Sequence, residues 1–388
     1  MRVLYDHQIF QYQRFGGISR YFYELLRHFH KSNTITALVP FRYTNNEHLL
    51  NLEKQFGFIE PVFLGRNNFP GKGKLWMLRN KYFPQYDESL INKKYVVDSL
   101  LRGDFDIFHP TYYDDYFLDY IGEKSVVITI YDLIYEKYPD CFPQSEVETV
   151  LRNKKKLIDR ANHIIVISES GKKDLLDIYK VNEKKVSVIY LGNSLNQDPW
   201  AANMVTANGI PEEYILYVGN RSSYKNFIFL IRSIQNILHN DKDLHVICTG
   251  EKFTSEEKRL FRELKIADRL IHKFVSDDEL TLLYKNAKIF VFPSLYEGFG
   301  IPVLEAMSNG CPVVLSNTSS LPEVGGDAAL YFNPMDSDSI SSTVYKCLSD
   351  DKMRIELTKK GIERVKLFSW KKTAIATADV YRQVLSNI

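Results

Sequence analysis

The chain has 388 residues, a length that predicts two domains of ordinary size. Hydrophobic residues make up 45% of it and charged residues 25%, which is typical of globular proteins and excludes a disordered chain. The 50 basic and 48 acidic residues leave a formal net charge of +2, and this near-balance argues against a nucleic-acid-binding protein, because that class usually carries a large basic excess.

The spacing of the cysteines and the lengths of the apolar runs indicate the compartment in which the protein resides. The four cysteines form no C-x-x-C pair, so we expect neither a disulfide framework nor a zinc site. The N-terminus lacks the apolar run of a secretory signal, and no stretch reaches the roughly 18 apolar residues of a membrane span. We therefore expect a cytoplasmic protein. The cysteines are Cys141, Cys248, Cys311 and Cys347.

The first half of the chain alternates between strand and helix patterns. A short apolar strand over 2–6 precedes a loop that ends in Gly16 and Gly17, and apolar residues then recur at helical spacing over 18–29. A strand, a glycine loop and a helix in this order open a doubly wound parallel sheet. Further strands are expected over 105–109, 126–131, 163–168 and 185–190, with a helix over 170–179.

The pattern fades around residues 193–209, which read as a linker, and then restarts. Two consecutive arrays of this kind predict an α/β protein with two Rossmann-like domains that face each other across a cleft. We place the first domain at 1–195 and the second at 205–369. In the second domain, strands are expected over 214–218, 245–249, 271–274, 287–292 and 312–315, with a helix over 227–238.

The segment YEGFGIPVLEA, at 296–306, carries the densest chemical signal. A strand ends just before it, and its glycine-rich loop turns into a helix near Pro302. The backbone N–H groups of such a loop and the helix dipole favour an anion. Glu297 and Glu305 would repel a phosphate there unless they accept hydrogen bonds from hydroxyls, which sugars supply. The alternative interpretation is a helix start whose acidic residues merely favour the dipole.

This segment resembles the E-x7-E motif of the retaining glycosyltransferases of family four, the group 1 family, which have the GT-B fold. The likeness continues in the family's order through FGGISRYFYEL, FDIFHP, HIIVISESGKKDLL, LYVGNRSSYKN and SSLPEVGGDAALYFNP, so it spans essentially the whole chain. It is a likeness to members such as the bacterial O-antigen and capsule mannosyltransferases. It also implies that the last helix, within 370–388, packs back across the first domain.

The resemblance assigns roles to the residues of the motif. In the family the first glutamate contacts the transferred sugar and the second binds the nucleotide ribose hydroxyls, which implies Glu297 and Glu305 here. The backbone amides of Phe299, Gly300 and Ile301 are then expected to hold sugar hydroxyls and phosphate oxygens. The family uses neither a metal ion nor a cofactor, so basic side chains must neutralise the diphosphate.

Arg221 and Lys225, in the turn after the first strand of the second domain, are the candidates for that neutralisation. Lys225 and the following Asn226 match the family's pattern. Arg221 lies earlier in the turn than the family's arginine, and Tyr224 stands beside the lysine instead. The alternative is a pair of solvated surface cations.

The first domain contributes further candidates at the ends of its strands. Gly16 and Gly17 lie where a backbone can approach a phosphate closely, although a plain turn is the alternative. The resemblance places a cleft histidine near the donor sugar at His109, for which a core histidine is the alternative. Asp132 ends the next strand, and the family's histidine before it is replaced here by Tyr131.

Two regions give weaker signals. Val275, within 274–276, is expected to contact the nucleotide base through its backbone. The segment 65–86 is basic and aromatic and has no acidic residue, so it could rest on an anionic membrane, bind a lipid-diphosphate acceptor, or be a solvated insertion. A membrane contact would place the protein at the inner face of the cell membrane.

Together these features predict a retaining, metal-independent GT-B glycosyltransferase of surface polysaccharide assembly. We expect it to move a hexose from a nucleotide diphosphate sugar, GDP-mannose before a UDP-hexose, to a glycan or a polyprenyl-diphosphate-linked acceptor. A GT-B nucleotide-sugar 2-epimerase and a non-catalytic sugar-nucleotide-binding subunit are the alternatives. A dinucleotide oxidoreductase is disfavoured, because no G-x-G-x-x-G follows a predicted strand.

Overall fold

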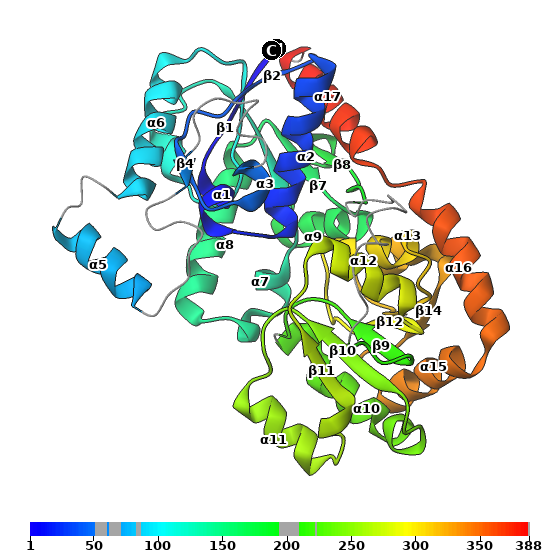
Figure 1. Cartoon of the computed structure of the whole chain (residues 1–388). Coiled ribbons are helices and arrows are strands. Elements are labelled where there is room, and N and C mark those ends of the chain that lie inside the picture. Colours follow the sequence, from blue (N-terminus) through cyan, green and yellow to red (C-terminus); the bar gives the residue numbers. More distant parts are fainter. Residues whose placement is uncertain (51–59, 62–70, 83–86, 194–208, 222, 387–388) are drawn as a thin grey trace.

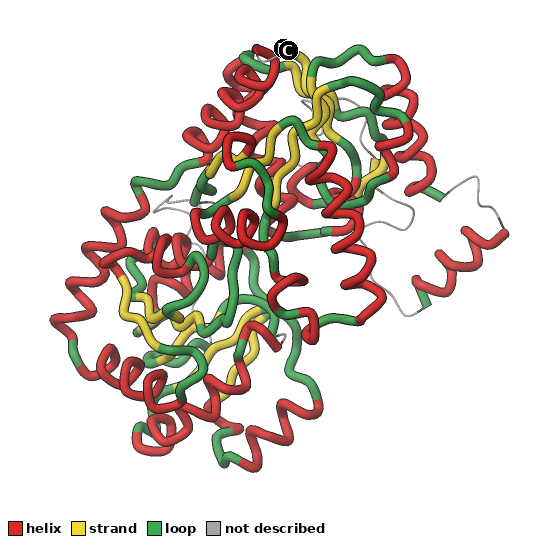
Figure 2. The backbone as a smooth tube through the Cα atoms, turned by 180° about the vertical axis from the view of Figure 1, so that it is seen from behind, coloured by secondary structure: helices red, strands yellow, loops and turns green. Residues whose placement is uncertain are grey.

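The chain folds into two α/β domains, each built around a parallel six-stranded sheet (Figure 1). Helices cover the strands of both sheets, as the view from behind also shows (Figure 2). The expected α/β class with two doubly wound domains is therefore confirmed. The structure, a computed structural model, describes residues 1–50, 60–61, 71–82, 87–193, 209–221 and 223–386.

The first sheet has the strand order β2-β1-β5-β6-β7-β8. Its central strands are apolar runs rather than alternating ones, because helices bury both of their faces. In the register of β1 and β5, Tyr5 lies opposite His109, so the ends of these strands lie side by side. The strands are β1 (Arg2–Tyr5), β2 (Thr36–Leu38), β5 (Ile107–His109), β6 (Ser125–Ile130), β7 (His163–Val166) and β8 (Val186–Val188), while β3 (Tyr43–Thr44) and β4 (Glu60–Pro61) form a separate pair.

The helices of the first domain follow its strands in the expected alternation. The helix that follows the glycine pair begins at Gly17 and buries the apolar face read from the sequence. Ser168 caps the helix after β7, where its hydroxyl accepts a hydrogen bond from the N–H of Gly171. The helices are α1 (Gln8–Tyr12), α2 (Gly17–Ser32), α3 (Glu47–Leu50), α5 (Lys72–Tyr82), α6 (Glu88–Arg102), α7 (Ile134–Lys137), α8 (Gln144–Arg160) and α9 (Glu169–Tyr179).

The second sheet has the order β11-β10-β9-β12-β13-β14. Its strands are β9 (Tyr214–Tyr217), β10 (His245–Thr249), β11 (Leu270–Lys273), β12 (Ile289–Phe292), β13 (Val313–Ser316) and β14 (Ala329–Phe332). The helices are α10 (Phe227–Asn240), α11 (Ser255–Glu263), α12 (Asp277–Asn286), α13 (Ile301–Ser308), α14 (Leu321–Gly325), α15 (Ser337–Ser349), α16 (Asp351–Val365) and α17 (Trp370–Ser386).

The last helix, α17, leaves the second domain and packs beside α2, β6 and β7 of the first (Figure 1). Hydrogen bonds fix it there: the Thr373 hydroxyl donates to the carbonyl of Tyr190 at 2.7 Å, and the Tyr381 hydroxyl lies 2.9 Å from that of Tyr5. This is the crossing that the family resemblance implies. The proposed boundary between the domains falls mostly in 194–208, outside the described residues.

Four of the described strands were not predicted from the sequence. The strands β2, β3 and β4 have only two or three residues each, so they are too short to show a period, and β14 is a half-buried strand at the edge of the second sheet. All four cysteines are free. None of the described helices is long and apolar enough to cross a membrane.

Candidate active site

The loop between β12 and α13 lies where the two domains meet. A Cβ built on Gly298 would overlap the backbone carbonyl oxygen of Tyr131 and crowd the side chain of Asp132, so this loop lies against the end of β6 in the first domain. Only glycine allows such a close approach of two backbones. The ends of strands in both sheets therefore face one another across this contact, as expected for ligand sites in doubly wound folds.

Hydroxyl groups after β13 hold this loop in shape. The Ser320 hydroxyl lies 2.9 Å from the carbonyl oxygens of both Glu297 and Phe299, and the Ser319 hydroxyl accepts the N–H of Glu297 at 2.9 Å. Gly300 begins α13 with a φ of 106°, a left-handed conformation that favours glycine. Within the described chain no side chain caps α13, so its first-turn amides and its dipole suit an anion.

Lys225 and Glu297 form a half-enclosed ion pair beside this loop. The Nζ of Lys225 lies 2.6 Å from Oε1 of Glu297, and the two side chains are 15% and 12% exposed. Burial alone would lower the pKa of Lys225, but the negative charges of Glu297 and Asp132 and the nearby Tyr224 outweigh it and raise that pKa. The structure thus brings together three of the predicted catalytic residues.

Arg221 turns away towards α11. Its Nε lies 2.6 Å from Oε1 of Glu257, its Nη2 donates to the carbonyl of Lys252 at 2.9 Å, and its guanidinium lies over the ring of Phe253. The charge that we expected to meet the diphosphate is already neutralised in this arrangement. The proposed role of Arg221 stays a prediction that requires the pair with Glu257 to open.

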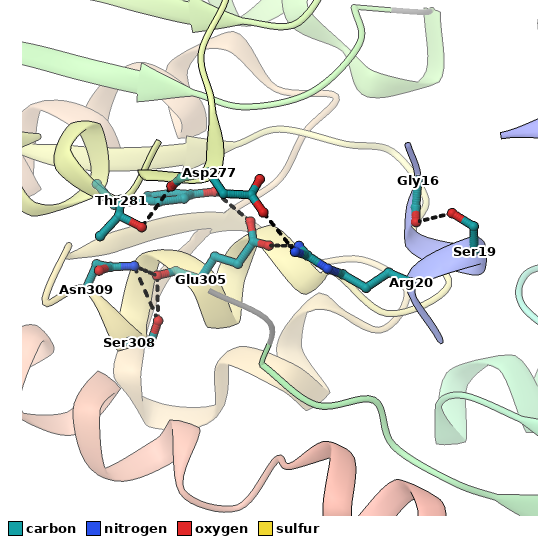
Figure 3. Close-up of polar contacts among 9 residues, drawn as sticks. Gly16, Ser19, Arg20, Asp277, Thr281, Glu305, Ser308 and Asn309 are labelled. Carbon is teal, nitrogen blue, oxygen red and sulfur yellow. Dashed lines mark hydrogen bonds and ion pairs between the residues drawn. The ribbon is translucent and has the colours of Figure 1, made fainter. Parts of the chain in front are cut away.

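Glu305 lies buried in the first turns of α13 and is met by a cation from the other domain (Figure 3). Arg20, on α2, reaches 3.9 Å from Oε1 of Glu305 and 2.9 Å from Oδ2 of Asp277. Burial raises the pKa of Glu305 to about 7; the charge of Arg20 and a 3.3 Å hydrogen bond from Tyr284 oppose the rise, and the charge of Asp277 adds to it. The sequence reading missed Arg20, although it stands three residues after Gly17.

The glycine pair lies next to this group. A Cβ on Gly17 would lie 3.7 Å from Cδ1 of Ile301, so the loop of the first domain faces the start of α13. A Cβ on Gly16 would overlap the side-chain oxygen of Gln13, which accepts the N–H of Ser19 at 3.1 Å. Because Gln13 has a flexible side chain and Gly16 has an extended φ of 166°, this contact does not by itself require a glycine at 16, and phosphate contact there stays a prediction.

The expectation for His109 is wrong. Its side chain is fully buried, with Nδ1 2.6 Å from the hydroxyl of Tyr381 and Nε2 2.9 Å from that of Thr129. Burial lowers its pKa to about 3, so the ring is neutral. The helix α17 covers this strand end, and the histidine links β5 and β6 to that helix instead of facing a substrate.

The remaining predicted residues lie near the domain contact. Asp132 is half-exposed beside Gly298 and accepts the N–H of Ile134 through Oδ1 at 3.2 Å. Val275 is half-buried between β11 and the start of α12, next to the exposed Phe274. Their roles towards the acceptor and the base stay predictions.

A buried polar cluster after β1 was not singled out from the sequence. The Asp6 carboxylate accepts hydrogen bonds from the hydroxyl and N–H of Thr111 at 2.6 and 2.8 Å and from the side chain of Gln8 at 2.7 Å. Burial raises the pKa of Asp6 and lowers that of the adjacent His7 to about 4. Three polar residues directly after an apolar strand were the available signal.

The basic–aromatic segment lies partly outside the described residues, which include 71–82 of it. There α5 extends away from both domains (Figure 1) and exposes Leu75, Met77, Leu78 and Tyr82. Its suggested contact with a membrane or an acceptor stays a prediction.

Comparisons with known proteins identify the family. A family model described as Glycosyltransferase Family 4 matches residues 15–197, and one described as Glycosyl transferases group 1 matches 205–364. The chain is 29% identical to O-antigen chain mannosyltransferase B of Escherichia coli, covering 69% of this chain and 72% of that protein. It is 31% identical to O-antigen chain mannosyltransferase RfbU of Salmonella typhimurium, covering 57% of this chain and 60% of that protein.

Solved structures with the same fold cover the whole chain. Sucrose-phosphate synthase from Thermosynechococcus elongatus matches 100% of this chain and 99% of its own with a TM-score of 0.71 at 21% identity. Anabaena HepE in complex with UDP and glucose matches 97% and 98% with a TM-score of 0.69 at 16% identity. With its two domains matched in order by the two models, this chain belongs to the family 4, or group 1, glycosyltransferases.

Proposed function

We propose that this glycosyltransferase moves a hexose, with mannose from GDP-mannose as the leading candidate, to a hydroxyl of a glycan or polyprenyl-diphosphate-linked acceptor. The transfer retains the anomeric configuration, needs no metal ion, and serves O-antigen, capsule or other surface polysaccharide assembly in the cytoplasm. The names of the O-antigen mannosyltransferase relatives support the pathway and the sugar. The complexes of HepE with UDP and UDP-glucose support a nucleotide sugar.

One observation carries the proposal: the ion pair of Lys225 and Glu297 lies beside the loop before the uncapped start of α13, and Glu305 lies within that helix, where Arg20 of the other domain reaches it. A diphosphate at these amides would meet a positive dipole and a buried lysine, which stabilise negative charge as it grows on the leaving group. Glu297 and Glu305 would accept hydrogen bonds from the transferred sugar and from the ribose.

The acceptor hydroxyl must lose a proton during the transfer. His109 is enclosed in the core, so it does not supply the base. We infer a front-face reaction in which an oxygen of the leaving diphosphate takes this proton. We propose that Asp132, which is half-exposed beside Gly298, holds the acceptor.

A transfer assay tests the proposal. The purified protein is incubated with GDP-mannose or UDP-glucose and a polyprenyl-diphosphate-linked glycan in EDTA, and the products are analysed by mass spectrometry and NMR. An α-linked hexose on the acceptor, formed from the α-linked donor, supports a retaining transferase. A free epimerised sugar would indicate the 2-epimerase instead, and no reaction with either donor would favour a non-catalytic subunit.

A further inference from the structure

The donor site of the second domain includes a cation from the first. Arg20 lies one turn into α2, and its side chain is 17% exposed and crosses the domain contact (Figure 3). Its Nη2 donates to Asp277 at 2.9 Å, and its Nη1 lies 3.9 Å from Glu305. Asp277 is 66% exposed at the start of α12, whereas Glu305 is buried, so the two carboxylates hold the same guanidinium in different surroundings.

Arg20 favours the charged form of Glu305. The groups that face its carboxyl are Arg20 from α2 and Asp277 and Tyr284 from α12. Burial and Asp277 both favour the protonated form, while Arg20 is the only cation among these groups. A protonated carboxyl gives up acceptor capacity, and two neighbouring ribose hydroxyls need an acceptor on each oxygen.

We propose that Arg20 is a positioning residue of the donor site: it favours the ionised form of Glu305 for the nucleoside hydroxyls, and Asp277 holds Arg20 within reach. This rests on the proposed function, in which Glu305 receives the ribose. Within the described residues the Nε–H of Arg20 is enclosed and has no hydrogen-bond partner, so the guanidinium retains a donor beyond those that Asp277 and Glu305 occupy.

The arrangement links donor recognition to the approach of the domains. A separation of the domains would carry Arg20 away with α2 and leave Glu305 without this cation. A donor that binds the ionised carboxylate therefore favours the arrangement in which Arg20 is in place, and the reverse holds by linkage. Donor binding and domain approach then reinforce each other through one side chain.

The first test uses the protein without any ligand. Thermal unfolding is measured at pH 6.0 and 8.5 for the wild type, Arg20→Gln, Glu305→Gln and the double variant. Removal of Arg20 leaves a charged, uncompensated Glu305 at the higher pH, so the loss of Tm in Arg20→Gln should be larger at pH 8.5 by about 2 °C or more. The extra loss should vanish in the Glu305→Gln background. His48, beside Arg20, has its pKa lowered to about 4 by burial and stays neutral across this range.

Arg27→Gln is the matched control, because Arg27 lies on the same helix and pairs with Glu24 inside the first domain. Its Tm change should be equal at both pH values. A Tm loss in Arg20→Gln that is the same at pH 6.0 and 8.5, or an extra loss at pH 8.5 that persists in the Glu305→Gln background, overturns the inference.

The second test measures the Kd of GDP-mannose and of UDP-glucose by calorimetry at pH 6.5 and 8.5. Arg20→Gln should weaken binding on the order of 10-fold at pH 6.5, and the deficit should shrink several-fold at pH 8.5, where Glu305 ionises without help. Arg20→Lys should restore much of the affinity. A deficit equal at both pH values overturns the inference and leaves the proposed function intact. Wild-type protein that binds neither nucleotide sugar contradicts the proposed donor, while the unfolding cycle still decides the role of Arg20.

Discussion

The ends of β5 and β12 differ in what covers them. Both strands belong to parallel sheets, and their carboxyl ends face the other domain. A polar residue stands at or after each end: His109 is the last residue of β5, and Glu297 follows β12 in the next loop. The helix α17 seals the first, so His109 binds Tyr381 and Thr129 in the core. The second opens into a loop whose carboxylate meets Lys225. A polar residue at the end of a strand therefore indicates a ligand site only when no helix covers that strand end.

Among changes near the loop after β12, replacement of Lys225 should lower activity the most. Lys225→Met removes the cation next to the diphosphate and leaves Glu297 half-enclosed without its partner. We expect kcat/KM to fall by about 100-fold or more, because the lost charge stabilises the transition state. Initial rates of transfer from GDP-mannose measure this, with Lys285→Met, on the exposed side of α12, as the control. Rates close to the wild type would show that Lys225 is only structural.

The contact between the loop after β12 and the end of β6 can be disrupted at Gly298. Gly298→Ala places a methyl group against the carbonyl of Tyr131, so the loop and the end of β6 must separate. Activity should fall about 10-fold or more, since a displacement near 1 Å disrupts the alignment of reacting groups. The far-ultraviolet circular dichroism should stay unchanged. An unaltered rate would contradict the close contact, and Ser342→Ala on α15 serves as the neutral comparison.

Substitutions at the covered end of β5 should lower the stability of the protein and not its catalytic rate. His109→Ala removes two buried hydrogen bonds and leaves a cavity, at a cost of about 2–4 kcal/mol in the free energy of unfolding. Denaturant titration measures that loss. Tyr381→Phe should be non-additive with it, because both changes break the same contact. A large fall in kcat of the folded variant at unchanged stability would return His109 to the catalytic groups.

The ionisation of Glu305 should make the stability of the protein depend on pH. Its pKa is about 7 in the folded protein, above that of an exposed glutamate, so the folded state binds more protons than the unfolded state between about pH 4.5 and 7. Stability from this group is full below that window and is lost as the pH rises through 7, by on the order of 3 kcal/mol. Glu305→Gln should lack this loss, so its Tm should exceed that of the wild type increasingly up to about pH 8. Parallel Tm curves for the two proteins would contradict the buried carboxyl.

The sequence was sufficient where the signal is local. Strands such as His245–Thr249, the glycine-rich loop and the helix that starts at Ile301 are encoded by neighbouring residues, and they lie where their patterns indicate. Partners from distant segments were not visible. Glu257 neutralises Arg221 from 36 residues away, and Tyr381 encloses His109 from 272 residues away.

Arg20 is a second kind of residue whose role the sequence does not reveal. It reads as one basic residue on an amphipathic helix, and its function depends on Glu305 and Asp277, which only the packing of the domains brings to it. Sequence spacing within one domain contains no information on such a contact. The family motif predicted the carboxylate of Glu305 but not the cation that charges it.

The most direct test of a donor site at the start of α13 is calorimetric titration in EDTA of GDP-mannose, UDP-glucose, GDP and UDP into wild type and Glu305→Gln. We predict that one nucleotide and its nucleotide sugar bind the wild type, and that Glu305→Gln weakens the binding of both by about 10-fold or more, as expected when ribose hydroxyls lose a charged acceptor. Equal affinity of the two proteins for that nucleotide, or no binding to the wild type at all, would contradict it.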